Sequence, residues 1–379
     1  MSSAATASAA TSTAVSKKEQ LPWYRKGGMV VNSVGMAFNI VVPVIVLAST
    51  LPKDYQYNFL GLLLFSYAAA IWSGRTTLYC IVVVPTFMVS TVLAFFLEDP
   101  VNPFSSTSSL SLAAFCLALS TAVAIFKVNI CMSVCLHRYA AHAAFKCGPI
   151  TRIGLAVLGC LANQGGPIWW ASQHQCHHKH CDRPGDPHSP IISGTEHAFG
   201  FFQVHDQVLE EFVPAHLDSP LLRIIDTWAF TIVAMELYLS YIFLGPAGLF
   251  VTYTSGWLCQ TITLWFNVAN HPPPAKDTKS SSSAATTGKP AFNADCNALD
   301  NNVMDAWNDP CLKGVYLPFV LLNALIPVFG SLVMEREHGY HHDKPRLAQR
   351  SEHDTAYWGF VYPLEQLGLV WNVVLPTKK

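Results

Sequence analysis

Apolar stretches long enough to enter a membrane recur along this chain. Six of them hold at most one charged residue each: 29–50, 57–73, 77–97, 109–134, 230–250 and 251–268. An α-helix needs roughly 20 apolar residues to cross a bilayer, and these runs approach or exceed that length. A seventh run, 314–334, is equally apolar but contains Pro318 and Pro327. The pattern predicts an all-α integral membrane protein built as a transmembrane helical bundle.

Polar composition sets two segments apart from this bundle. The first 16 residues are mostly Ser, Thr and Ala, so we expect 1–28 to be a disordered tail and not a secretory signal. A chloroplast transit peptide, which would normally carry Arg, is the alternative. Residues 272–298 include the run KSSSSAATTG, which indicates a flexible surface insertion. The remainder, 29–379, is predicted to be one membrane domain, with extra spans at 29–73 before a core at 77–379.

Composition supports this assignment. The chain is 51% hydrophobic and 12% charged, whereas soluble domains carry about 25% charged residues. Its net charge is −1, without a basic block, so we expect no nucleic-acid partner. The 11 cysteines show no paired framework and are predicted to be reduced packing residues.

Nine of the 15 histidines fall into four clusters that follow apolar runs. The clusters are His137-Arg-Tyr-Ala-Ala-His142, His174-Gln-Cys-His177-His178, Asn267-Val-Ala-Asn-His271 and His338-Gly-Tyr-His341-His342. Residues three or four apart share one face of a helix and can bind one ion. Nine imidazoles exceed the needs of one ion, so the count predicts two metals. His137 and His142 are five apart, a spacing that would let each face a different metal.

Other polar residues near the clusters are interpreted differently. A single histidine in a helix usually hydrogen-bonds to a carbonyl and has no metal. Such hydrogen bonds do not explain why nine histidines occur at ligand spacing. His180 and His188 flank the second cluster and are expected to hydrogen-bond its members or to have no role. Cys176 and Cys181 remain alternative ligands to one metal. The isolated histidines are expected to be ordinary surface or loop residues: His197, His205, His216 and His353.

A shared metal centre requires all four clusters to lie on one side of the bilayer. The two spans between His178 and Asn267 satisfy this rule. The runs 148–162 and 314–334 must then be interfacial or re-entrant. Four crossings before His137 put the N-terminus on the metal side, and basic residues before the first span favour the cytosol for that side. These residues are Lys17, Lys18, Arg25 and Lys26.

The cluster order HxxxxH, HxxHH, NxxxH, HxxHH resembles the membrane fatty acid desaturases of the stearoyl-CoA (delta-9) type from about Thr77 onward. Trp170 precedes His174 by four residues, Asp186-Pro187-His188 follows the second cluster, and Glu335 precedes His338 by three, as in that family. The resemblance implies a cytosolic helical cap that holds a di-iron centre. Its ligands would be His137, His142, His174, His177, His178, His271, His338, His341 and His342, with Asn267 acting through a water.

The resemblance also implies an activity. Such a centre removes two hydrogens from a saturated acyl chain with O2 and two external electrons, leaving a cis double bond. Trp170 would shape the acyl tunnel, although a belt aromatic at the membrane interface is the alternative. Asp186 and Glu335 would support the ligands from outside. The implied substrate is an acyl-CoA or acyl-lipid. Electrons would come from NAD(P)H through cytochrome b5 and its reductase at the endoplasmic reticulum, or through ferredoxin in a plastid membrane.

The chain departs from the family near the substrate head group. Animal acyl-CoA desaturases have an Arg-Asp pair at the positions of Ser172 and Gln173, which leaves the acyl carrier open. The insertion at 272–298 and the extra N-terminal spans are further departures. The sequence contains no His-Pro-Gly-Gly haem signature, so we expect a separate electron donor.

Two other functions share part of this histidine pattern. A di-iron lipid or alkane hydroxylase would share the first hydrogen abstraction but add an oxygen atom. A histidine-lined metal transporter would place ligands within the spans and on both sides of the membrane, whereas these clusters can all be placed on one face. The NxxxH element favours desaturation.

Overall fold

The computed structural model describes residues 109–189, 208–270 and 338–377, together with Lys53, Gln56, Tyr57 and Gly61. The regular secondary structure of this part is almost entirely helical. Several predictions lie outside it, namely the tail 1–28, the spans 29–50 and 77–97, nearly all of 57–73, the insertion 272–298 and the run 314–334.

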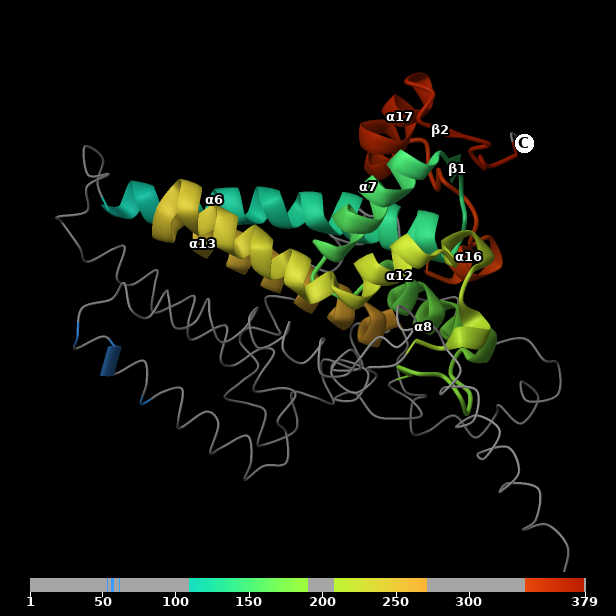
Figure 1. The fold of residues 1–379 in the computed structure, drawn as a ribbon, viewed down its shortest axis with the longest axis horizontal. Helices are drawn as coiled ribbons and strands as arrows, with labels where there is room; N and C mark the ends of the chain where they lie inside the picture. Colours follow the sequence, from blue (N-terminus) through green and yellow to red (C-terminus); the bar gives the residue numbers. More distant parts are fainter. Residues whose placement is uncertain are drawn as a thin grey trace, which may run out of the picture.

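Two long helices form one end of the described structure (Figure 1). Helix α6, Ser109–Phe126, continues directly into a π-helix, η3, Lys127–Ala141. Helix α13, Ala229–Asn270, runs beside it. Within the described part, the segments Ala114–Ala141 and Ala229–Asn267 are long and apolar enough to cross a membrane. Large apolar side chains on α13 are exposed, among them Tyr238, Ile242, Phe243 and Leu244, as expected for a surface that faces lipid.

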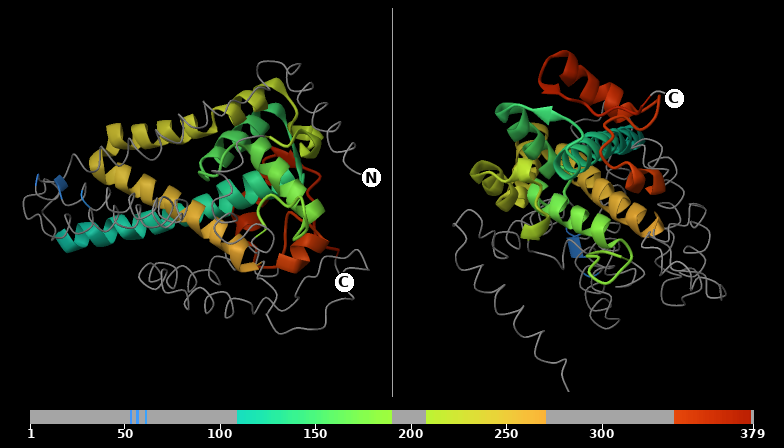
Figure 2. Two further views of the ribbon diagram at one scale, coloured as in Figure 1. Left: turned by 90° about the horizontal axis from the view of Figure 1, so that it is seen from below. Right: turned by 90° about the vertical axis from the view of Figure 1, so that its right-hand side faces the viewer.

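A sharp break divides α13 into two arms that fold back on each other (Figure 2). Gly245 at the break has φ 66° and ψ −158°, a conformation open mainly to glycine. Pro246 has no N–H to continue the hydrogen bonding of the preceding turn. The sequence predicted two runs here, divided between residues 250 and 251. Two arms are present, but the chain turns five residues earlier, where Gly and Pro permit it.

A part-buried ion pair joins η3 to α13. Lys127 is 2% exposed, and its Nζ lies 2.7 Å from Oε2 of Glu236. Each of the two apolar runs contains one charged residue, and the fold pairs these two residues with each other. Charges in an apolar setting are costly unless paired, so the pair favours the contact between η3 and the first arm of α13.

Short helices gather at the other end of the long ones (Figure 1). They are α7 Pro149–Cys160, α8 Pro167–His180, α12 Pro220–Thr227, α16 His338–Asp343 and α17 Tyr362–Gln366, with the π-helix η7 Tyr357–Val361 and the 3₁₀ turns η4 Glu210–Phe212 and η5 Ala215–Leu217. Helices α7, α8 and α12 each begin with proline, whose fixed φ suits the first helical position. The run 148–162 therefore contains a 12-residue helix, too short to cross a bilayer.

The C-terminal segment closes against the first histidine cluster. Strand β1, Lys146–Cys147, pairs antiparallel with β2, Val370–Trp371, a small departure from the all-α prediction. Arg138 and Asp354 form an ion pair at 2.8 Å, with both side chains fully buried. Asp354 also accepts the backbone N–H of Tyr357 at 3.0 Å. These contacts hold the residues that follow α16 next to η3.

Candidate metal centre

The π-helix η3 brings the two histidines of the first cluster onto one face. In an α-helix, residues five apart point about 140° away from each other. In a π-helix the hydrogen bonds run from residue i to i+5, so His137 and His142 lie one turn apart. The N–H of His142 donates to the carbonyl of His137 at 3.1 Å. The expectation that each faces a different metal assumed α-helical geometry, whereas in this structure both imidazoles point the same way.

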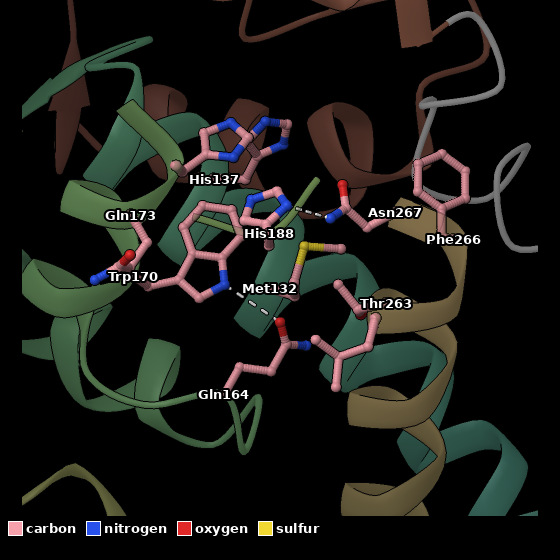
Figure 3. A pocket seen from close by; sticks show the side chains of 11 residues that line it. Met132, His137, Gln164, Trp170, Gln173, His188, Thr263, Phe266 and Asn267 are labelled. Atoms are coloured by element: carbon pink, nitrogen blue, oxygen red, sulfur yellow. Dashed lines mark hydrogen bonds between the residues drawn. The ribbon is translucent and has the colours of Figure 1, made fainter. Parts of the chain in front are cut away.

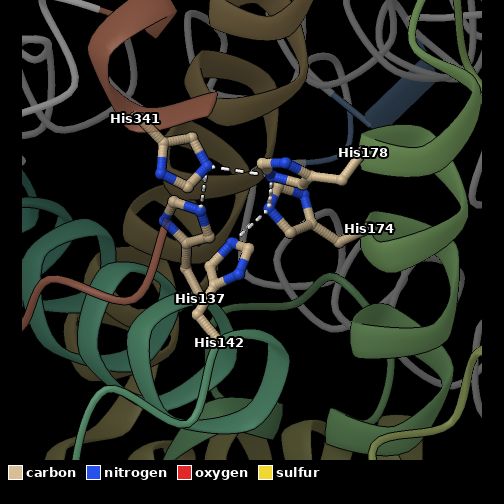
Figure 4. Close-up of side chains that lie close together, drawn as sticks. All are labelled: His137, His142, His174, His178 and His341. Atoms are coloured by element: carbon tan, nitrogen blue, oxygen red, sulfur yellow. Dashed lines mark hydrogen bonds between the residues drawn. The ribbon is translucent and has the colours of Figure 1, made fainter. Parts of the chain in front are cut away.

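Five imidazoles from three helices meet in one group (Figure 4). Helix η3 contributes two, α8 two and α16 one: His137, His142, His174, His178 and His341. Their Nε2 atoms approach in pairs. The distance is 2.9 Å between His142 and His174, and 3.0 Å for each of the pairs His174–His178, His178–His341 and His137–His341.

These distances fit a single metal ion. Imidazole nitrogens bind metals at about 2.1 Å, so two ligands at right angles around one ion would be about 3.0 Å apart. Four contacts fall at that value. A closed tetrahedral site would space the nitrogens at roughly 3.4 Å and would use four ligands. The donor set is thus suited to an ion with more than four ligands, and imidazole nitrogen suits iron among others.

A second group lies directly beside the first. His177 and His342 come together with Cys181, within 4.8 Å of one another by their ligand atoms. The rings of His178 and His342 stack at 4.2 Å, so the groups are contiguous. His338 begins α16, but its side chain, like His271 and Glu335, lies outside what the structure describes.

A carboxylate orients His177 from behind. Asp186 Oδ2 lies 2.9 Å from His177 Nδ1, the arrangement that fixes the tautomer of metal-ligating histidines. Asp186 was expected to play this supporting role. His188 stacks on His177 at 4.3 Å, and its Nδ1 is 2.5 Å from Nδ2 of Asn267. Asn267 thus lies next to the second group.

Burial keeps the imidazoles in the form that binds metal. Desolvation, followed by the neighbouring imidazoles His178, His137, His142 and His341, holds the pKa of His174 well below its usual value. Neutral histidine is the metal ligand. Burial raises the pKa of Cys176 to about 11, and its thiol donates to the carbonyl of Gly185 at 3.3 Å, so Cys176 is turned away from the imidazoles.

A pocket of about 70 Å³ opens onto these histidines (Figure 3). Its lining is Met132, His137, Gln164, Trp170, Gln173, His174, His188, Thr263, Leu264, Phe266 and Asn267. Trp170 is 9% exposed and stacks on His174 at 4.8 Å. Its Nε1 donates to Gln164 Oε1 at 3.2 Å. Trp170 is therefore a wall of the pocket, and the alternative of an interfacial belt aromatic does not fit its burial.

Ser172 and Gln173 are both buried. They occupy the positions where animal acyl-CoA desaturases have the Arg-Asp pair near the substrate head group. Ser172 Oγ donates to the carbonyl of Trp169 at 2.8 Å and accepts the N–H of Leu209 at 3.2 Å. Ser172 thus stabilises α8 against the segment before η4. Gln173 lines the pocket. Of the two, only Gln173 borders the space that a substrate could enter.

Sequence reasoning missed several residues of the site. Gln164, Met132 and Thr263 line the pocket, and Asp226 contacts the N-terminus of α8. Gln164 precedes Trp170 by six residues, which is no recognisable signal, and nothing in a single sequence distinguishes Asp226 from other acids. Their roles depend on contacts between distant segments.

Comparison with known proteins finds relatives that are fatty acid desaturases or an acetylenase. No family model matches it. It is 28% identical over 263 residues to the hex-5-enoyl-(acyl-carrier protein) acetylenase of Moorena producens (strain JHB), covering 65% of this chain and 74% of the relative. It is 32% identical over 133 residues to the sn-1 stearoyl-lipid 9-desaturase of Anabaena variabilis, covering 35% and 46%.

A shorter match is stronger in identity. Over 55 residues the chain is 46% identical to the acyl-CoA C20 Delta5-desaturase of Anemone leveillei, covering 14% of this chain and 18% of the relative. The chain thus spans less than half the length of two of these three relatives. The shared feature of the relatives is desaturation of acyl chains or its extension to a triple bond. Together they support the desaturase family for this chain.

Proposed function

We propose that this chain is an iron-dependent fatty acyl desaturase, an oxidoreductase that removes two hydrogens from an acyl chain. One observation carries the proposal: His137 and His174 belong both to the five-imidazole group and to the lining of the pocket. A chain bound in this pocket would lie against the metal ligands. Two irons would be held by the nine histidines, with His271 and His338 completing the second group and Asn267 acting through a water.

The metal would supply activation of O2 by external electrons, and the protein's own residues would position the chain. Trp170 and Met132 present apolar surface, whereas Gln164 and Thr263 add polar edges. An acyl chain that fills the pocket would displace water from beside the metal ligands. Introducing one double bond at a set position requires that the acyl chain be held in one register.

The relatives differ in the carrier of the acyl chain and in the position of the double bond. The names of the three relatives specify an acyl-carrier protein, a lipid and CoA. We propose a cis double bond at delta-9 from the likeness to the stearoyl-CoA type, with acyl-CoA or acyl-lipid as substrate. The electron donor would be cytochrome b5 with its reductase, or ferredoxin.

We further propose that the protein is integral to a membrane, with the histidine end in the cytosol at the endoplasmic reticulum. Two apolar helices support membrane association. Relatives described as chloroplastic, such as the palmitoyl-monogalactosyldiacylglycerol delta-7 desaturase of Arabidopsis thaliana, make a plastid membrane the alternative.

Expression of the full chain in a desaturase-deficient host, followed by fatty acid profiling, tests the proposal. We expect a product two mass units lighter than the saturated chain, with the double bond located by fragmentation. A product 16 mass units heavier would instead identify a hydroxylase. An unchanged profile, with protein present in the membrane fraction, would contradict both.

A further inference from the structure

The helix that carries the second histidine cluster lacks an N-cap side chain of its own. Helix α8 begins at Pro167, and its N-cap residue is Gly166. The first N–H groups of a helix have no partner within the helix, and a side chain at the N-cap usually accepts one of them. At α8 a different helix supplies the acceptor.

Asp226 on α12 performs this role. Its Oδ1 accepts the N–H of Ile168 at 2.7 Å and the N–H of Trp169 at 2.9 Å. These donors are the second and third helical residues, the same pair that an N-cap side chain serves. Trp170, a wall of the pocket, follows directly, and His174 comes four residues later.

The contact is too close to tolerate a side chain at Gly166. A Cβ built there would lie 2.6 Å from the Cα of Asp226 and overlap its carboxylate. The φ of Gly166 is −89°, which any residue can adopt, so space and not backbone conformation requires glycine. Gly166 and Asp226 therefore form a matched pair.

A carboxylate at this position is both costly and useful. Asp226 is 9% exposed, and burial raises its pKa to about 6 although the two N–H groups and Arg223 oppose the shift. A negative charge at a helix N-terminus is favourable. Arg223 is itself paired with Glu210 at 2.7 Å and with Asp218 at 3.2 Å, which anchors α12 in turn.

We propose that Asp226 is a positioning residue that caps α8 from α12 and thereby sets where the second histidine cluster stands. Helix α8 supplies His174 and His178 to the five-imidazole group and His177 to the second group. A shift of its first turn moves ligands of both groups. This inference rests on one part of the proposed function, namely that these histidines bind metal.

Four variants of the full chain in detergent test the proposal, with binding of Co²⁺ followed by its visible absorption. Asp226→Asn keeps an oxygen acceptor, whereas Asp226→Leu has similar size and none. Gly166→Ala pushes on the same contact from α8. Asp218→Ala is the control, since this acid pairs with Arg223 and is not the acceptor for α8. Thermal unfolding of each variant shows that binding is measured on folded protein.

We expect Asp226→Leu and Gly166→Ala to weaken Co²⁺ binding about 10-fold or more, because a displaced α8 moves ligands of both groups much as loss of a residue that orients a ligand does, and to change the absorption spectrum. Asp226→Asn and Asp218→Ala should bind within about threefold of wild type. The Leu and Ala changes should be non-additive when combined, because they break one contact.

Equal binding by Asp226→Asn and Asp226→Leu would overturn the proposal, as would full additivity in the double variant. Unchanged Co²⁺ affinity with only a lower unfolding temperature would also overturn it, because that result assigns Asp226 to stability alone. Absence of Co²⁺ binding by the wild type is a different result: it would overturn the proposed metal centre and the function that depends on it.

Discussion

The two histidine groups differ in what stands behind their imidazoles. In the five-imidazole group, the Nδ1 of His137 faces the guanidinium of Arg350 at 3.4 Å, and the Nδ1 of His142 faces the amide of Gln175 at 3.5 Å. In the second group, the Nδ1 of His177 faces the carboxylate of Asp186 at 2.9 Å.

The carboxylate is itself held in place. Asp186 Oδ2 accepts the N–H of Asp182 at 2.9 Å, and Oδ1 accepts the N–H of His188 at 3.1 Å. A fixed carboxylate orients the ring and makes it a stronger ligand, whereas a cation or an amide does not. A fixed carboxylate therefore orients His177 in the second group, whereas the first group brings more imidazoles together. Two bound irons would then differ in electron density.

Removing one imidazole from the five should have the largest effect. His178 contacts both His174 and His341 at 3.0 Å, so His178→Ala opens the middle of the group. We expect unsaturated product to disappear and iron per chain, measured by mass spectrometry of the purified protein, to fall. His353→Ala, at an exposed histidine, is the matched control. Normal product from His178→Ala would contradict the site.

Replacing the carboxylate behind His177 should come next. Asp186→Asn keeps the size of the side chain but removes its charge, and we expect metal affinity to fall by about 10 to 100-fold. Gln175→Ala, the corresponding change behind His142, should lower affinity far less because the contact is long. Titration with Fe²⁺ under anaerobic conditions measures both. Equal losses of Fe²⁺ affinity in the two variants would contradict the proposed difference between the groups, because the carboxylate would then matter no more than the amide.

The pH dependence of folding stability should reveal the burial of Asp226, which caps α8. The pKa of Asp226 is raised to about 6 from about 4 in an unfolded chain. The folded state therefore holds this proton over a range in which the unfolded state has released it, and stability falls as pH rises from about 4 to about 6.

The size of the pKa shift of Asp226 sets the largest change in the free energy of unfolding across this pH range. About two pH units correspond to roughly 3 kcal/mol. We expect the unfolding temperature of wild type relative to Asp226→Asn to decrease across that window and then level off. Arg223, Glu210 and the neighbouring Cys160 are the same in both proteins. A rising difference would mean that the charged carboxylate stabilises the fold more than burial opposes it.

The smallest effect is expected at Cys181, beside the second group. Burial and the carboxylates of Asp182 and Asp186 raise the pKa of its thiol, and its Sγ lies 3.9 Å from Asp182 Oδ2. Cys181→Ser should leave metal content and product within about twofold of wild type. Loss of one metal in this variant would make the second group a mixed Cys and His site.

Local spacing was enough to predict some of the site. His174, His177 and His178 lie at helical intervals, and α8 is indeed a helix, so its side chains point where the spacing says. The same reasoning did not predict that His137 and His142 lie one turn apart, because the sequence pattern does not distinguish the π-helix η3 from an α-helix. Trp170 was predicted from the family resemblance, and its burial beside His174 agrees with a pocket wall.

By itself, the sequence determined that the long elements are apolar helices, and it predicted from spacing which histidines could bind metal, because periodicity and composition act locally. Only the tertiary structure decided that five imidazoles from three helices converge, that Asp186 stands behind His177, and that Asp226 caps α8 across the Gly166 contact. These outcomes depend on packing between segments far apart in the chain, and a single sequence carries no record of that packing.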